Sequence, residues 1–381
     1  MTRITGNWID TPATQAVFDL LETTGHQGYF VGGCVRNALL GVSVSDIDIT
    51  SAATPDLVVN AAKDAGLKVI PTGIDHGTVT VMSGDIAHEI TTFRRDVETD
   101  GRHAEVAFSA SMEEDAARRD FTVNALYADR TGVVFDPVDG LPDLDARRFK
   151  FIGDADARIA EDYLRILRFF RFHAWYGDAA AGLDANALAA CAAGVDGLEG
   201  LSGERVGSEM LKLLRAPDPA PAMAAMAQAG VLARVMMGAD AKALPILVHL
   251  EAGRAPSAAR RVACVGGFGL KEAWRLSNAE ANRIDALRGM VGDITGLPEI
   301  AYRHDETLAW DVALLRGALF EQPLAPDTDV LIERGAKASF PVKANDLMPK
   351  FEGPALGAKL KDLEARWIAS GFGLSKSELL A

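Results

Sequence analysis

Sequence patterns typical of β-strands are confined to the first third of the chain, whereas patterns typical of α-helices run through its whole length. Short apolar or alternating segments bounded by turn residues predict strands at 29–31, 45–51, 67–70, 76–82 and 87–94. Helical spacing of apolar residues predicts helices between them, at 13–24, 34–41 and 54–66. From residue 155 onward one helical pattern follows another. We therefore predict an α+β protein in which a small mixed sheet is followed by an all-helical remainder.

A chain of 381 residues is too long for one ordinary core, and two sequence signals divide it. The turn FDPVDG follows the last strand signal, and the proline-rich segment APDPAP is the clearest linker. We expect domains at 1–140, 141–216 and 217–381, of which only the first contains the sheet. Within that domain the polar segment 94–108 predicts a long loop, and such loops in compact domains are either functional or disordered.

The charge balance and the cysteines argue against several classes of protein. A net charge of −14 counts against non-specific wrapping of nucleic acid, although it leaves room for a local basic groove. No segment approaches the roughly 18 consecutive apolar residues of a membrane helix, and the first residues do not resemble a signal peptide. The cysteines Cys34, Cys191 and Cys264 are far apart and have no metal-binding spacing. We expect buried free thiols in a cytoplasmic protein.

The segment GGCVRNALLGVSVSDIDIT places a glycine pair, a helix and an Asp-x-Asp strand in close succession. Because strand side chains alternate between faces, Asp46 and Asp48 should project the same way, and divalent cations stabilise such a carboxylate pair. Gly32 and Gly33 permit close backbone approach, and the start of the next helix forms a phosphate cradle that Arg36 can reach. Asp-x-Asp alone is more often an exposed strand face. The combination indicates a site for Mg²⁺ and a triphosphate.

A second segment, ARRDFTVNAL, contains strong phosphate donors. Arg118 and Arg119 stand beside Asp120, a carboxylate that can fix their geometry. An ordinary surface ion pair at the start of a helix would give the same pattern. The segment is therefore a candidate phosphate-binding element.

A third segment, EDYLRILRFFRF, predicts a helix with a charged face. Asp162, Arg165 and Arg168 are spaced three residues apart and are expected to share one face, which Arg171 continues. The plain interpretation is an amphipathic helix with an ion-paired surface, and the sharper one is a protein template for a base. Cytosine and adenine both present an amine donor and a ring-nitrogen acceptor, which an Asp and an Arg can pair with. Uracil and guanine would leave buried groups unpaired, at roughly 1–3 kcal/mol each.

Taken in order, these motifs resemble the DNA polymerase β nucleotidyltransferase superfamily. More narrowly, they are similar to the class II tRNA nucleotidyltransferase (CCA-adding enzyme) and bacterial poly(A) polymerase family. The resemblance covers about residues 28–214. It implies a catalytic head at 1–140, a nucleotide-selecting neck at 141–216, and a helical body and tail at 217–381 that form the probable tRNA-binding region.

The resemblance also assigns roles to single residues. It implies that Asp46 and Asp48 hold two Mg²⁺ ions, with Glu89 either a third carboxylate or an exposed residue of an edge strand. It implies that Asp162 and Arg165 read the base. The full set of nucleotide-binding residues that it implies is Gly32, Gly33, Arg36, Arg119, Asp120, Asn124, Asp162, Arg165, Arg168 and Arg171.

Other positions that the resemblance covers have a supporting role or depart from the family. Glu204, Arg205 and Glu209 occupy positions where the family stabilises the template helix, and Ser202 is expected to cap the helix that carries them. Asn37 stands where the family often has Asp, which is expected to weaken an orienting contact without touching a metal ligand.

The implied reaction is Mg²⁺-dependent, template-independent addition of CCA to the 3′ end of tRNA from CTP and ATP, with release of pyrophosphate. The segment 94–108 resembles a flexible element associated with the final A step, which favours this reaction over the alternative, a poly(A) polymerase adding AMP to RNA 3′ ends. A non-catalytic RNA-binding module is disfavoured by the intact motifs, and a nucleotidyltransferase acting on small molecules by the long helical extension. Neither a membrane nor an obligate protein partner is implied.

The region after residue 216 matches no motif. Its basic residues could form a phosphate-facing strip, although a solvated face is equally consistent for each of them: Arg254, Arg260, Arg261, Lys271 and Arg275.

Overall fold

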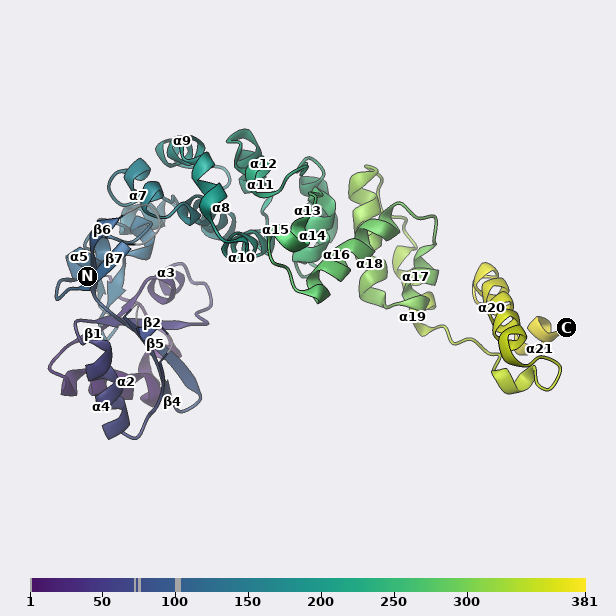
Figure 1. Ribbon diagram of the computed structural model, residues 1–381, viewed down its shortest axis with the longest axis horizontal. Coiled ribbons are helices and arrows are strands. Elements are labelled where there is room, and N and C mark those ends of the chain that lie inside the picture. Colours follow the sequence, from purple (N-terminus) through teal and green to yellow (C-terminus); the bar gives the residue numbers. More distant parts are fainter. Residues whose placement is uncertain (1, 72, 75–76, 100–103) are drawn as a thin grey trace. The chain divides into compact units, whose positions relative to one another are not determined.

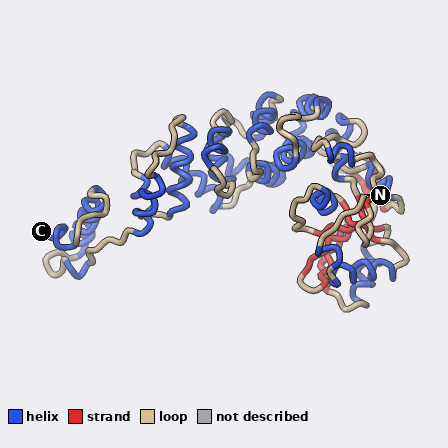
Figure 2. The backbone as a smooth tube through the Cα atoms, turned by 180° about the vertical axis from the view of Figure 1, so that it is seen from behind, coloured by secondary structure: helices blue, strands red, loops and turns tan. Residues whose placement is uncertain are grey.

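The computed structural model describes residues 2–71, 73–74, 77–99 and 104–381. Its contacts group into two units, unit 1 (Met1–Val235) and unit 2 (Met236–Ala381). The described strands all lie in unit 1, where Figure 2 shows them in red, and helices make up the regular structure of unit 2. This confirms the predicted α+β class. Among the described residues, no helix is both long enough and apolar enough to cross a lipid bilayer.

A seven-stranded sheet in the order β3-β4-β5-β2-β1-β8-β9 forms the centre of the first part of unit 1. Its strands are β1 (Gly28–Val31), β2 (Ile47–Ser51), β3 (Lys68–Ile70), β4 (Thr78–Ser83), β5 (Ile86–Thr92), β8 (Tyr127–Ala128) and β9 (Val134–Phe135). The β2 strand pairs in parallel with β5 and antiparallel with β1, so the sheet is mixed, as predicted. Every second residue of β4 is buried, because one face of this strand packs against helices.

The head helices cover this sheet and fix the strand that carries the aspartates. They are α1 (Asn7–Asp10), α2 (Pro12–Thr23), α3 (Gly33–Leu39) and α4 (Pro55–Asp64). The α2 and α4 helices pack against each other and against β4 (Figure 1). The rings of Phe18 and Phe30 meet edge to face with centroids 4.7 Å apart, which ties α2 to β1. The short α3 contacts both β1 and β2, the two strands that it joins.

The segment 94–108 was predicted to be a long loop, and this prediction is wrong. It forms a two-stranded antiparallel hairpin of β6 (Arg94–Thr99) and β7 (Ala104–Phe108), with an irregularity between Asp96 and Glu98. Residues 100–103, in the middle of the predicted loop, lie outside the described residues. The sequence of β6 is polar and carries no strand signal, and the alternation of Ala104, Val106 and Phe108 in β7 is too short to predict a strand by itself.

A series of helices completes unit 1 and begins where the strand signals end. They are α5 (Met112–Ala117), η2 (Thr122–Asn124), α6 (Leu141–Asp145), α7 (Ala155–Glu161), α8 (Leu164–Tyr176), α9 (Ala185–Ala193), η3 (Val195–Gly200), α10 (Gly203–Leu214), α11 (Ala220–Gln228) and α12 (Val231–Val235). The α8 helix packs on α10 and α11. Its residues Phe169 and Phe172 also contact the ring of Phe121, at 6.3 Å and 5.5 Å between centroids. These contacts fix α8 beside the segment that carries Arg119 and Asp120.

Unit 2 consists of helices around two separate apolar cores. They are α13 (Leu244–Glu251), α14 (Ala258–Val265), α15 (Leu270–Ala273), α16 (Asn278–Val291), α17 (Leu297–Arg303), α18 (Glu306–Leu319), α19 (Thr328–Lys337), η4 (Ala344–Asp346), α20 (Gly353–Ala369) and α21 (Lys376–Leu380). The α18 helix contacts α13, α14, α16, α17 and α19 and is the centre of the first core. Trp367 of α20 is the centre of the second, with Val342, Leu347, Leu363 and Leu379.

A group of charged residues, all buried except the half-buried Arg283, lies in the first core of unit 2. We call it the unit 2 ion cluster, and its members are Glu251, Arg260, Arg261, Arg283 and Asp311. Arg260 pairs with Glu251 and with Asp311 at 2.6 Å each, Arg261 pairs with Glu251 at 2.6 Å, and Arg283 pairs with Asp311 at 2.7 Å.

The expectation of an exposed basic strip therefore fails for two of its residues. Arg260 and Arg261 are buried and face carboxylates rather than solvent. Their partners come from α13 and α18, and no local sequence pattern reveals such distant partners. Arg254, in contrast, is exposed and stacks on Trp310, with its guanidinium carbon 3.5 Å from the ring centroid.

Candidate active site

The glycine pair forms a turn at which four other predicted site residues meet. Gly32 has φ 68°, in the region that favours glycine, and caps α3. A Cβ atom on Gly32 would lie 3.5 Å from both Nη1 of Arg119 and the backbone oxygen of Asn124. A Cβ atom on Gly33 would lie 3.9 Å from Oδ2 of Asp48 and 4.0 Å from Nη2 of Arg36. The turn therefore borders one carboxylate and two arginines.

Three carboxylates lie at the edge of this turn. Asp48 is part of β2 and half-buried, whereas Asp46 precedes the strand, is exposed, and accepts a hydrogen bond from Ser45 Oγ at 2.9 Å. Glu89 of β5 stands directly opposite Asp48 in the parallel register, so it shares that face of the sheet. Burial, reinforced by the negative charges of Glu89 and Asp46 and opposed by Arg119, raises the pKa of Asp48 to about 6.

These carboxylates suit Mg²⁺ as part of a coordination shell whose other ligands come from the substrate. Within the described residues, no group of three or more His, Cys, Asp or Glu side chains is arranged to hold a metal ion by itself. Mg²⁺ commonly takes one or two carboxylates and fills its remaining positions with water and substrate phosphates. Burial is the main cause of the raised Asp48 pKa, and the repulsion by Glu89 and Asp46 that adds to it is what a bound cation would relieve.

Arg36 lies on α3 with its guanidinium enclosed between the sheet and α8. Its Nη1 donates to Oδ1 of Asn124, and its Nη2 donates to Oδ1 of Asn37 at 2.9 Å. Its guanidinium carbon lies 4.3 Å from the ring centroid of Tyr176 and 4.9 Å from that of Phe172. Burial lowers the pKa of Arg36. Asn37, the departure from the family pattern, thus still orients Arg36, through a neutral amide oxygen instead of a carboxylate.

Arg119 is held by a residue that the sequence analysis missed. Asp120 was expected to fix it, but the carboxylate that does so is Asp115, one helical turn earlier on α5. Oδ2 of Asp115 accepts from Nε and Nη2 of Arg119 at 3.1 Å and 2.9 Å. Burial alone lowers the pKa of Arg119, but the Asp115 charge outweighs it and the pKa is raised. The spacing i, i+4 between Asp115 and Arg119 is the signal that could have revealed the pair.

Asp120 instead links the head to α8. Its Oδ1 accepts from Nδ2 of Asn124 at 3.0 Å, and its Oδ2 accepts from Nε of Arg168 at 2.7 Å. Burial by itself raises the pKa of Asp120, but the Arg168 charge and these hydrogen bonds lower it to about 2. A hydrogen-bonded chain therefore runs from Arg36 through Asn124 and Asp120 to Arg168.

The predicted base-reading residues lie at the start of α8 but do not share one face of it. The helix begins at Leu164, so Asp162 precedes it, and its Oδ1 accepts the Leu164 N–H at 3.1 Å. Oδ2 of Asp162 accepts from Nη2 of Arg205 on α10 at 2.7 Å. Arg165 donates to Oε2 of Glu161 at 2.5 Å and to the backbone oxygen of Arg118 at 3.1 Å. The single charged face that the spacing predicted is wrong for Asp162, because α7 ends and α8 starts around it.

The last arginine of the row is held by α10. Nε of Arg171 donates to Oε2 of the buried Glu209 at 2.5 Å, and its guanidinium carbon lies 4.1 Å from the Phe172 ring centroid. Ser202 caps α10 by accepting from the N–H of Arg205, as predicted. Arg205 and Glu209 thus contact Asp162 and Arg171, which agrees with the supporting role expected of them.

A glycine turn beside paired carboxylates on a mixed sheet, with arginines on two sides, defines a nucleotidyltransferase head. In agreement, the family model described as the poly A polymerase head domain matches residues 28–150. A second model, described as the probable RNA and SrmB-binding site of polymerase A, matches residues 183–242.

Comparison with individual proteins narrows the class. The chain is 35% identical over 342 residues to the CCA-adding enzyme of Geobacillus thermodenitrificans, which covers 85% of this chain and 81% of that protein. A shorter match, 41% over 205 residues, links it to the human mitochondrial CCA tRNA nucleotidyltransferase 1 and covers 54% of this chain and 47% of that protein.

Among solved structures, the CCA-adding enzyme of Bacillus stearothermophilus in complex with CTP is similar over 95% of this chain and 94% of that one. The TM-score is 0.76 at 29% identity. The chain belongs to the family of CCA-adding enzymes, the tRNA nucleotidyltransferases.

Proposed function

We propose that this chain adds C, C and A in turn to the 3′ end of tRNA, using CTP and ATP and releasing pyrophosphate. The observation that carries this function is the glycine turn of Gly32 and Gly33, around which Asp48, Arg36 and Arg119 converge in a chain of the CCA-adding enzyme family. The regions 1–140, 141–216 and 217–381 would serve as catalytic head, nucleotide-selecting neck and tRNA-binding body and tail. A cytoplasmic location remains our expectation from the sequence, since the three cysteines are buried free thiols.

In this proposal Asp46 and Asp48 hold Mg²⁺, and Glu89 is the third carboxylate. Bound there, Mg²⁺ would favour deprotonation of the attacking 3′ hydroxyl and neutralise charge on the phosphates. The chain itself positions the triphosphate. The two glycines let phosphate oxygens approach the backbone, and Nη1 of Arg119, which makes no hydrogen bond within the described residues, faces Gly32. Arg36, held by its asparagine partners and two rings, supplies a second buried positive charge.

The base is selected by pairing with Asp162 and Arg165. A carboxylate offers about four lone-pair positions, and Asp162 uses two of them in the described contacts, so it can still accept from the amine of cytosine or adenine. Arg165 has five N–H donors, and three of them contact Arg158, Glu161 and Arg118. Its remaining donors suit a ring-nitrogen acceptor, and a uracil or guanine would leave these groups unpaired.

One assay tests the function. The full chain is given tRNA lacking its terminal CCA, Mg²⁺, and CTP, ATP, UTP or GTP singly and together. Growth by three nucleotides with CTP and ATP, and by two with CTP alone, is the expected result. A long A ladder with ATP alone would select the poly(A) polymerase instead, and no extension by the folded protein would refute both. Asp46→Ala should abolish extension while tRNA binding persists, and retained turnover would contradict the metal assignment.

A further inference from the structure

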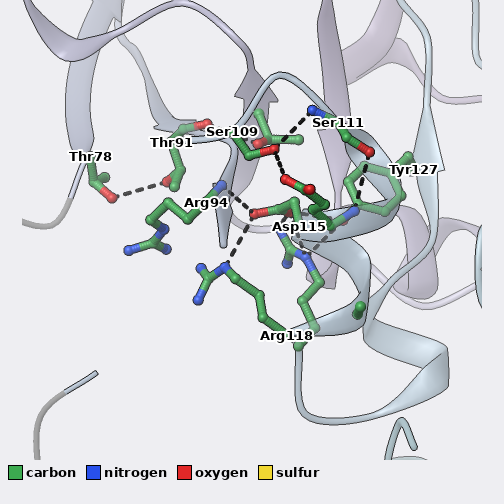
Figure 3. A network of polar contacts seen from close by, with 12 residues as sticks. Thr78, Thr91, Arg94, Ser109, Ser111, Asp115, Arg118 and Tyr127 are labelled. Carbon is green, nitrogen blue, oxygen red and sulfur yellow. Dashed lines mark hydrogen bonds and ion pairs between the residues drawn. The ribbon is translucent and has the colours of Figure 1, made fainter. Parts of the chain in front are cut away.

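Asp115 lies outside the predicted motifs, yet it contacts an arginine of the nucleotide site directly. Its side chain is fully buried at the end of α5. Oδ2 accepts from two nitrogens of Arg119 and from the hydroxyl of Tyr127 at 2.8 Å, and Oδ1 accepts from Nε of Arg118 at 3.4 Å (Figure 3). Burial by itself raises the pKa of Asp115, but the charges of Arg119 and Arg118 outweigh it and the pKa is lowered.

These contacts determine where Arg119 points. A guanidinium is planar, so two nitrogens held by one carboxylate fix the direction of the third. Nε and Nη2 of Arg119 face Asp115, and the third nitrogen, Nη1, is the atom beside Gly32. The ring of Tyr127, whose centroid lies 5.4 Å from the guanidinium carbon, contacts the same group. Asp115 therefore acts behind Arg119, on the side away from the glycine turn.

The same carboxylate contacts the base of the β6–β7 hairpin. Oδ1 of Asp115 accepts the backbone N–H of Arg94, the first residue of β6, at 3.3 Å. The other end of the hairpin is fixed to the start of α5. There, Ser109 Oγ donates to Glu114 and accepts the N–H of Ser111 at 3.0 Å (Figure 3). The backbone N–H of Ser109 also donates to the oxygen of Phe93 at 2.8 Å, which closes the base of the hairpin.

We propose that Asp115 is a positioning residue, which orients Arg119 toward the nucleoside triphosphate and couples this orientation to the base of the hairpin. The inference rests on the proposed function, because it requires a triphosphate at the glycine turn. Asp115 does not touch the nucleotide. A shift of the hairpin base is transmitted to Arg119 through one carboxylate, and a triphosphate bound by Arg119 restrains the hairpin base in return.

The first test is Asp115→Asn in the full chain. The amide keeps the size and one oxygen of the carboxylate but loses the charge that holds the guanidinium. The dissociation constants for CTP and ATP, measured by calorimetry, should rise about tenfold, since hydrogen bonds to charged groups are the strong ones. The matched control is Asp311→Asn, another buried carboxylate that holds two arginines, in unit 2. Asp311→Asn should lower the melting temperature about as much as Asp115→Asn does, and it should leave the CTP dissociation constant within about twofold of the native value.

A double-mutant cycle separates positioning from general damage. In an Arg119→Ala background, Asp115→Asn should weaken CTP binding by less than about twofold, because the group that Asp115 acts through is gone. An equal tenfold loss in both backgrounds would overturn the proposal, as would unchanged affinity in the single variant. If Asp115→Asn does not fold, Arg119→Lys takes its place, since it keeps the charge beside Asp115 but lacks the fork. It should melt like the native chain and bind CTP about tenfold more weakly, and native affinity would contradict the role.

Hydrogen exchange tests the coupling to the hairpin. CTP should slow exchange of the Arg94 amide in the native chain, and this protection should be lost in Asp115→Asn. If CTP binds the native chain and leaves that amide unchanged, the coupling is refuted. Failure of the proposed function is distinguishable, because it appears as a native chain that binds CTP but does not extend tRNA. A native chain that extends tRNA beside an Asp115→Asn variant with native CTP affinity refutes the positioning role alone.

Discussion

The proposed nucleotide site of unit 1 and the unit 2 ion cluster use the same chemical groups in opposite ways. Around the glycine turn, Arg119 and Arg168 each meet a buried carboxylate on one side, and their side chains remain 20% and 33% exposed. In the unit 2 ion cluster, Arg260 and Arg261 are 5% and 1% exposed and face carboxylates inside the core. An arginine held by a carboxylate on one side can still bind a second anion, whereas Arg260 and Arg261, enclosed by carboxylates inside the core, contribute to the fold alone.

This difference predicts a separation of activity from stability. Substitutions at the glycine turn should reduce nucleotidyl transfer without destabilising unit 1. Substitutions in the unit 2 ion cluster should destabilise that unit without changing nucleotide affinity.

The largest effect is expected for Asp48→Asn. The variant keeps the size of the side chain but removes a charge at the proposed metal site, and the rate of CMP addition should fall by about a thousandfold or more. Its melting temperature should equal or exceed the native value, because a carboxylate among like charges becomes a neutral amide. Single-turnover kinetics and thermal melts check both parts. A rate of CMP addition near the native one, or a large loss of stability, would contradict the predicted separation of activity from stability in unit 1.

The next largest effect is expected for Glu251→Gln, because Glu251 pairs with both Arg260 and Arg261. Removing one partner of a buried ion pair leaves uncompensated charge, and unit 2 should lose about 3–5 kcal/mol of stability. Urea denaturation followed by tryptophan fluorescence measures this loss, and calorimetry should give a native CTP dissociation constant. Weakened CTP binding in the folded variant would show that the two regions are not independent.

A smaller effect is expected for Asp162→Ala. Loss of the acceptor should reduce discrimination of CTP over UTP by about 10–100-fold and lower the rate of CMP addition less than Asp48→Asn does. The ratio of kcat/KM values for the two nucleotides is the measurement. Because Arg205 also loses its partner, Arg205→Ala is the matched control, and it should leave the ratio within about threefold. Unchanged discrimination in Asp162→Ala would contradict base reading by this residue.

The smallest effect concerns pH and the pair of Asp120 with Arg168. The pKa of Asp120 is about 2 in the folded chain, below the usual value of roughly 3.9 in an unfolded chain. The ionised group therefore contributes stability that is complete above about pH 4 and declines as the pH falls toward 2, and its size is about 2 kcal/mol. Denaturation of the native chain and of Asp120→Asn between pH 7 and pH 3 should show a stability difference that narrows only at the acid end. A constant difference would mean that Asp120 is not held as an anion.

Much of the head could be predicted from the sequence, because its signals are local. The glycine pair, the short helix and the Asp-x-Asp segment are adjacent in the chain. The parallel pairing of β2 with β5 places the exposed Glu89 beside Asp48, whereas the sequence left open whether it faces this site or is an exposed residue of an edge strand. The two-part division into a sheet and a helical remainder also follows from periodicity alone.

The sequence analysis missed contacts whose partners lie on distant elements and elements whose sequence pattern gives little signal. Arg260 and Arg261 resembled surface charges because their partners lie on other helices. Both pair with Glu251 of α13, and Arg260 also pairs with Asp311 of α18. The β6–β7 hairpin resembled a loop because β6 is polar and the apolar alternation of β7 is short. The i, i+4 spacing made Asp115 a possible partner of Arg119, but the sequence analysis chose the adjacent Asp120. Adjacency in the sequence does not determine which way a side chain points at the end of a helix.

Arg36 has a consequence for how this chain responds to its substrates. Its guanidinium is desolvated against two aromatic rings, and its Nε is, among the described residues, a buried nitrogen without a hydrogen-bond partner. Removing a cation from water costs free energy that asparagine oxygens recover only in part. Under the proposed function, a triphosphate at the turn would supply the missing negative charge, and part of this desolvation cost would be recovered when substrate binds. The melting temperature of the chain, measured with and without CTP, would then report on Arg36, because bound substrate would stabilise the folded head.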